Sequence, residues 1–115
     1  MDLGLRDKVI MVAAASRGLG FAIARAVALE GARVSIASPT ESRIHEAASK
    51  LREETGSEVI PCVFDAVDGD SIVAWFQDTC SSFGGVNGLV VNAGGPPTGG
   101  FDDFTDQDWQ DAFEL

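Results

Sequence analysis

Apolar runs and amphipathic segments alternate along the chain. Four short runs rich in Val, Ile and Ala have the length and composition of buried strands. Between them, apolar residues recur with the period of a helix that buries one face. The pattern predicts strands at Val9–Ala13, Ala32–Ser38, Val59–Phe64 and Gly88–Asn92, and helices at Leu19–Glu30, Glu41–Thr55, from Asp68 to Gly84 and from about Asp106.

The order of these elements predicts an α/β fold. A helix that joins two strands by a right-handed crossover makes the strands parallel and packs back on the sheet. Repeated units of this kind give a doubly wound parallel sheet with helices on both faces, and we expect the strand order 3-2-1-4. The length favours a single domain over residues 1–115.

Residue types at the helix ends support the predicted boundaries. Gly31, Gly56 and Gly84 stand where a helix commonly ends in a left-handed residue. Thr105 and Asp108 have the spacing of a capping box, which places the start of the last helix directly after Thr105.

Composition and charge exclude several classes of function. The chain has 8 Lys+Arg against 18 Asp+Glu, so its formal charge of −10 disfavours nucleic acid as a partner. The acidic residues are spread out in a way that is typical of solvated surfaces, and we expect no metal site. No apolar run approaches the roughly 18 residues that span a bilayer, so we expect a cytoplasmic protein without a membrane segment.

The cysteines and large aromatic residues are expected to have structural roles. Cys62 and Cys80 lack CxxC spacing and are predicted to be free thiols in the core. Trp75, Phe76 and Trp109 are likewise expected to be core side chains.

The segment Lys8–Gly20 carries the strongest chemical signal. It consists of an apolar strand, a turn of small residues and the start of a helix, with Gly18 and Gly20 at the helix opening. The first N–H groups of such a helix point at the turn and favour an anion there. The segment therefore predicts a cradle for a nucleotide phosphate, and the structural alternative is a tight corner that binds nothing.

Three motifs at consistent intervals resemble those of the short-chain dehydrogenase/reductase family. The segment Ala13–Gly20 is similar to the family's TGxxxGxG, with two of three glycines retained. Asp65-Ala66 resembles the Asp-Val that follows the third strand, and Val91-Asn92-Ala93-Gly94 resembles NNAG after the fourth. The resemblance covers the whole chain and implies a Rossmann-like fold.

The resemblance also implies which residues contact a dinucleotide cofactor. Residues of the glycine turn would line the pyrophosphate and ribose, Asp65 would bond the adenine, and Asn92–Gly94 would contact the adenosine ribose. The cofactor-binding residues implied in this way are Ala14, Ser16, Arg17, Gly18, Leu19, Gly20, Ser38, Asp65, Ala66, Asn92, Ala93 and Gly94. Two of them have structural alternatives, since Asp65 could cap a helix or turn and the Asn92 amide could close its own loop.

Two residues depart from the family pattern. Ala14 stands where the family has its first glycine, and we expect a turn that this residue can form with φ below zero. Val91 replaces the first Asn of NNAG, which removes a polar link between neighbouring strands.

The residue at the end of the second strand bears on the choice between NAD and NADP. NAD-preferring sites place an acid there for the ribose 2′-hydroxyl, whereas Ser38 carries no charge to repel a 2′-phosphate. Arg17 and Arg43 could reach that phosphate, and Ser38 or Thr40 could bond it. NADP is therefore favoured over NAD, although Pro39 stands where many relatives have an arginine.

The chain lacks the residues that carry the family's chemistry. It has no tyrosine, whereas the family's general acid is the Tyr of YxxxK, assisted by Ser and Asn. We therefore expect the nucleotide-binding half of an oxidoreductase, truncated before the later strands, that acts on an unknown carbonyl or alcohol in its full length and is inactive alone. A non-catalytic dinucleotide-binding regulatory module is the alternative. Residues Leu89–Val91 would leave a sheet edge open, and we expect a homo-oligomer.

Overall fold

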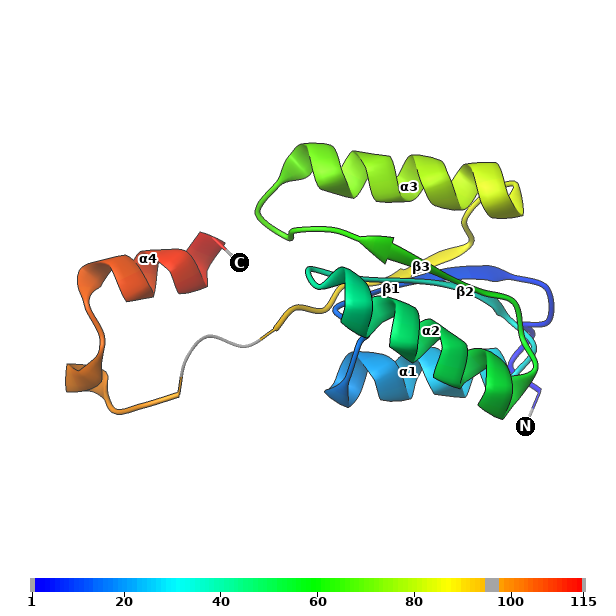
Figure 1. The fold of residues 1–115 in the computed structure, drawn as a ribbon, viewed down its shortest axis with the longest axis horizontal. Coiled ribbons are helices and arrows are strands. Elements are labelled where there is room, and N and C mark those ends of the chain that lie inside the picture. Colours follow the sequence, from blue (N-terminus) through cyan, green and yellow to red (C-terminus); the bar gives the residue numbers. More distant parts are fainter. Residues whose placement is uncertain (1, 95–97, 115) are drawn as a thin grey trace.

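The predicted sheet and its strand order are confirmed. A computed structural model of the chain describes residues 2–94 and 98–114. Four parallel strands form one sheet in the order β3-β2-β1-β4, and helices follow the strands along the chain (Figure 1). The elements are β1 (Val9–Ala13), α1 (Gly18–Leu29), β2 (Arg33–Ser38), α2 (Glu41–Thr55), β3 (Val59–Val63), α3 (Gly69–Phe83), β4 (Gly88–Val90), a short 3-10 helix (Phe101–Asp103) and α4 (Asp106–Glu114).

Helices cover both faces of the sheet. Figure 1 shows α1 and α2 on one face and α3 on the other, so the chain has two layers of core. The larger cluster includes Val12, Ile36 and Leu51, which are fully buried between the sheet and α1 and α2. The smaller cluster, on the α3 side, contains Phe64 and Trp75. Successive strand residues point to opposite faces, so each inner strand contributes to both clusters.

A ring of buried hydrogen bonds joins α3 to β2. The indole Nε1 of Trp75 donates to Ser35 Oγ at 2.8 Å, and the Ser35 and Thr79 hydroxyls lie 2.7 Å apart. Thr79 Oγ1 donates to the Trp75 carbonyl at 2.8 Å, so its single proton is used and Ser35 is the donor between the two hydroxyls. Each polar group of this ring has a partner, which is the condition for burying it without penalty.

The predicted helix ends are confirmed. Gly56 and Gly84 follow α2 and α3 with left-handed φ values of 71° and 84°. At the start of α4, Thr105 N donates to Asp108 Oδ2 at 2.8 Å and Asp108 N donates to Thr105 Oγ1 at 3.2 Å, which is the expected capping box. The remaining boundaries differ from the prediction by two residues at most.

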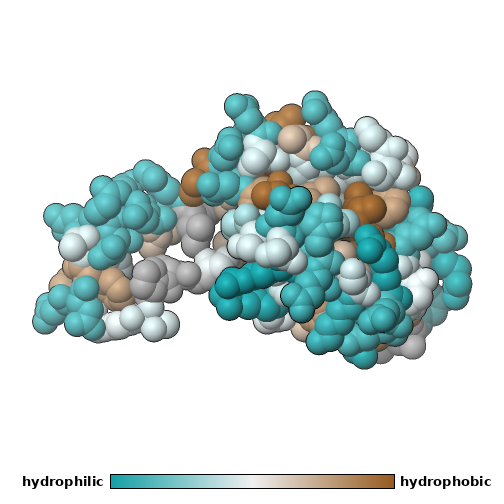
Figure 2. Space-filling view, in the orientation of Figure 1, coloured by the Kyte–Doolittle hydropathy of each residue, from teal (hydrophilic) through white to brown (hydrophobic). Residues whose placement is uncertain are grey.

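The C-terminal segment stands apart from the sheet (Figure 1). Trp109 packs against its neighbours Phe101 and Phe104, with ring centroids 5.7 and 6.2 Å apart. The prediction of a core position is correct for Trp75, which is 3% exposed, but wrong for Trp109 and Phe76, which are 43% and 49% exposed. Phe76 belongs to α3, and Figure 2 shows hydrophobic side chains at the surface over this helix.

Candidate functional site

One cleft collects nearly all the residues predicted for the site. It has a volume of about 510 Å³ and lies where the four strands end, at the carboxyl edge of the sheet. Eleven of the twelve predicted residues line it, and the twelfth, Gly20, is buried beneath it. The eleven are Ala14, Ser16, Arg17, Gly18, Leu19, Ser38, Asp65, Ala66, Asn92, Ala93 and Gly94.

The floor of the cleft is the turn between β1 and α1. All five residues of β1 are buried, and Ala15 N donates to Ala37 O at 3.2 Å, which ties the turn to the end of β2. Arg17 is the N-cap of α1 and makes no side-chain cap hydrogen bond, and the first turn of the helix contains no acidic residue. The first N–H groups of α1 therefore remain available to an anion in the cleft.

The expected conformation of Ala14 is wrong. Its φ is +53°, in the left-handed region, whereas a φ below zero was expected. The hydrogen bonds on either side explain why the backbone holds this conformation. Asn92 Nδ2 donates to the carbonyls of Ala13 and Ala14 at 3.3 and 3.4 Å, and the next residue is bonded to β2. The turn is thus fixed from two neighbouring strands, which offsets the steric cost of the alanine methyl.

Gly20 allows α1 to approach this turn. A Cβ at Gly20 would clash with the carbonyl oxygen of Ala14 and lie 2.9 Å from Asn92 Nδ2. Asn92 therefore has the loop-closing role that its amide suggested, while the same residue also lines the cleft. Its contact with the glycine turn physically couples the end of β4 to the cradle.

Asp65 shapes the loop that follows β3. Its Oδ1 accepts a hydrogen bond from Val67 N at 3.1 Å, and its own N–H donates to Ser71 Oγ at 3.0 Å. A carboxylate has further acceptor positions, so this turn leaves Asp65 able to accept from a ligand. The sequence motifs do not indicate Ser71, because its role depends on how α3 folds back toward the end of β3.

The opposite wall contains the last residue of β2 and the residues that follow it. Ser38 is buried, and its Oγ donates to Thr40 O at 3.4 Å. Arg17 and Arg43 reach the cleft from the starts of α1 and α2, and both are exposed. Phe64 forms an apolar part of the lining that the motifs did not indicate. An uncharged residue and two guanidinium groups therefore surround the end of β2.

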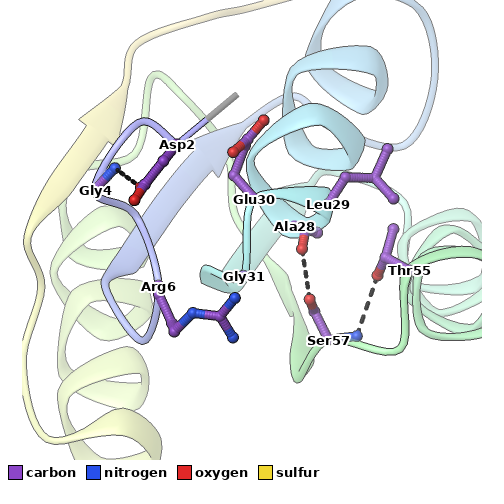
Figure 3. A pocket seen from close by; sticks show the side chains of 9 residues that line it. All are labelled: Asp2, Gly4, Arg6, Ala28, Leu29, Glu30, Gly31, Thr55 and Ser57. Atoms are coloured by element: carbon purple, nitrogen blue, oxygen red, sulfur yellow. Dashed lines mark hydrogen bonds between the residues drawn. The ribbon is translucent and has the colours of Figure 1, made fainter.

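A different hollow lies at the other end of the sheet, where α1 and α2 end (Figure 3). It has a volume of about 610 Å³, and none of the twelve predicted residues is among the described residues that line it. Ser57 Oγ donates to Ala28 O at 2.6 Å, and Ser57 N donates to Thr55 Oγ1 at 3.2 Å. Arg6 and Glu30 bring charges of both signs. Its hydroxyl groups thus bond the neighbouring backbone, as at an ordinary helix-to-strand connection.

The described residues show neither a metal site nor a membrane-spanning helix. Over residues 2–94 and 98–114, no group of three or more His, Cys, Asp or Glu side chains is arranged to hold a metal ion. No helix in the same segments combines the length and the apolar content needed to cross a bilayer.

Fold and cleft together define an α/β domain of the Rossmann type, in which ligands bind across the carboxyl ends of parallel strands. Comparison with known proteins gives the family. The chain belongs to the short-chain dehydrogenase family, whose model matches residues 8–115. The resemblance inferred from the three motifs is therefore confirmed.

Two of the similar relatives are named as reductases. A protein named as a ketoacyl reductase of the monensin polyketide synthase of Streptomyces virginiae is 35% identical over 109 residues, which cover 95% of this chain and 41% of that protein. The 3-oxoacyl-(acyl-carrier-protein) reductase of Chlamydia muridarum is 35% identical over 94 residues, or 82% of this chain and 38% of that one.

A solved structure matches the fold closely. The L-sorbose reductase of Gluconobacter frateurii, complexed with NADPH and L-sorbose, is 36% identical with a TM-score of 0.89. The match covers 100% of this chain and 44% of the sorbose reductase chain. The present chain thus spans less than half the length of the relatives it matches.

Proposed function

We propose that this chain forms the cofactor-binding half of an NAD(P)-dependent oxidoreductase that interconverts a carbonyl and an alcohol. The observation that carries the proposal is the convergence of four strand ends on one cleft, with the uncapped start of α1 at its floor. A nicotinamide cofactor bound there would supply the hydride transfer. The protein's part would be to hold and orient that cofactor.

The residues of the cleft fit the parts of a dinucleotide. Free N–H groups at the start of α1 suit a pyrophosphate, and the small residues around Gly18 let the ligand approach the backbone. Asp65 offers a carboxylate to the exocyclic amine of an adenine. Asn92 would act mainly by fixing the turn, because its amide donates to the carbonyls of Ala13 and Ala14.

NADP suits the second strand end better than NAD. Ser38 presents a hydroxyl and no negative charge, and Arg17 and Arg43 line the same cleft. Guanidinium groups form strong charge-assisted bonds with a phosphate. The sorbose reductase was solved with NADPH, as was a 31% identical actinorhodin polyketide ketoreductase, and both support this preference.

Reduction of a carbonyl needs a proton donor as well as a hydride. In the short-chain dehydrogenase family that donor is the Tyr of YxxxK, and the 115 residues contain no tyrosine. We therefore expect the chain alone to bind cofactor without turning over a substrate. Turnover of a carbonyl substrate by the 115-residue chain would contradict the expectation that this chain binds the cofactor without catalysing the reaction.

Titration calorimetry with NADPH and NADH tests the binding proposal. We expect NADPH to bind about tenfold more tightly than NADH, and Arg17→Ala to remove most of that difference, since a bond to a charged group contributes about 1.5–3 kcal/mol. Arg6→Ala is the matched control, because it removes the same charge at the opposite end of the sheet. Equal affinities in all three proteins would contradict the NADP preference, and no binding of either nucleotide would contradict the proposed function.

A further inference from the structure

A second hollow adjoins the cleft, between α1 and α2. It has a volume of about 370 Å³, and its walls carry the cationic side chains of Arg17, Arg43 and Lys50. Phe21 provides an apolar surface, and Glu46 is the one carboxylate among the lining residues described. The whole chain has only 8 Lys+Arg and a formal charge of −10. Three of these eight cations are therefore concentrated in one hollow of an acidic protein.

The two cations on α2 lie at separate points along the length of the hollow. Arg43 and Lys50 are seven residues apart, which places them on the same face of the helix, two turns or about 10.5 Å apart. Lys50 Nζ lies 5.4 Å from the centroid of the Phe21 ring on α1, so the lysine leans across the groove. Arg17, at the start of α1, completes the group.

These charges are free to act on a ligand. Among the described residues, an ion pair joins Arg25 to Glu54 and a contact of 3.9 Å joins His45 to Glu41, and neither involves a cation of this hollow. A concave surface concentrates the field of the charges that line it, and three cations of one sign make an anion the preferred occupant. A single phosphate would engage one end only, whereas several linked phosphates could span the distance from Arg43 to Lys50.

We propose that this hollow is a second anion site, which binds a multivalent oxyanion of the polyphosphate class beside the cofactor cleft. The site itself does not depend on the proposed function. Its consequence for the cofactor does, because Arg17 and Arg43 line both the hollow and the cleft. An anion in the hollow and a 2′-phosphate in the cleft would share these guanidinium groups, so each weakens the binding of the other.

Inorganic tripolyphosphate is the probe for the site. We expect titration calorimetry on the full chain, at constant ionic strength, to show binding that Lys50→Gln weakens about tenfold. Lys8→Gln is the matched control, because it makes the same charge change just before β1, at the other end of the sheet. Equal weakening in both variants, or no binding of tripolyphosphate, would overturn the proposal.

Competition with the cofactor tests the position of the anion. We expect tripolyphosphate to weaken NADPH binding more than NADH binding, and Lys50→Gln to reduce this effect while leaving NADPH affinity unchanged when tripolyphosphate is absent. Equal competition against both nucleotides would place the anion in the pyrophosphate part of the cleft and overturn the separate site. Lysine-dependent binding of tripolyphosphate in a protein that binds neither nucleotide would refute the proposed function and leave the anion site intact.

Discussion

Replacing Ala14 by glycine should stabilise the protein. Ala14 lies in the glycine turn with φ +53°, a conformation in which the methyl group approaches its own backbone. The conformation is held by the bonds from Asn92 to the turn carbonyls and from Ala15 to β2, none of which needs the Ala14 side chain. Ala14→Gly therefore removes the steric cost and keeps the contacts.

The expected gain follows from two opposing effects. A left-handed conformation costs an alanine about 1–2 kcal/mol, and glycine avoids this cost. Glycine also gives the unfolded chain more conformational freedom, which costs about 0.5–1 kcal/mol of stability. The difference is a gain of about 0.7 kcal/mol, which corresponds to a rise in Tm of about 3 °C for a domain of this size.

A control at another alanine separates the two effects. Ala22 is exposed within α1, where its backbone is helical, so Ala22→Gly should lower stability by about 1 kcal/mol. Urea and thermal denaturation of both variants should therefore give shifts of opposite sign. If Ala14→Gly destabilises the protein as much as Ala22→Gly does, the strain assigned to Ala14 is refuted.

Two further predictions concern the face of the sheet covered by α3. Ser35→Ala should lower stability by about 1–3 kcal/mol, because the buried Trp75 Nε1 loses its acceptor, and an unchanged urea midpoint would contradict this. Burial, and to a smaller extent the charge of Asp78, raise the pKa of the Cys62 thiol above its ordinary 9.0. The native state thus keeps this proton at pH values where the unfolded chain loses it. The contribution of this pKa shift to the free energy of unfolding is fully present below pH 9.0 and is lost as the pH rises toward the native pKa. The urea midpoint should therefore fall more between about pH 8 and pH 10 in the wild type than in Cys62→Ala, and equal falls would contradict the shift.

The fold could be predicted from the sequence because each level of the pattern agrees with the others. Buried strands such as Val9–Ala13 are apolar throughout, as a sheet covered on both faces requires. Glycines at the ends of α2 and α3 and the capping box of α4 then set the boundaries. The exposure of Trp109 could not be predicted in this way, because helical spacing shows which side chains share a face but not what that face contacts.

The lining of the cleft could be predicted because strand ends converge in a parallel sheet. Residues at or just beyond the carboxyl ends of strands, such as Ser38 and Asp65, fall in the cleft once the topology is known. The conformation of Ala14 was not predictable from residue type, since its φ is imposed by bonds from distant strands. The ring of Ser35, Trp75 and Thr79 was missed for the same reason, because hydroxyls in apolar elements carry no periodic signal.

The cleft is physically linked to an apolar groove on the other side of its wall. This groove, of about 790 Å³, lies between α3 and the outer strand β4, and it is lined by exposed side chains such as Phe76 and Leu89. Phe64, Ala66 and Asn92 line both the groove and the cleft. Phe64 is held from the α3 side by Trp75, whose ring centroid lies 5.0 Å away. Any chain segment that packs into the groove therefore contacts the wall against which the cofactor is proposed to bind. Because coupling between two binding sites is reciprocal, a segment in the groove that raised cofactor affinity would itself bind more tightly when the cofactor is present.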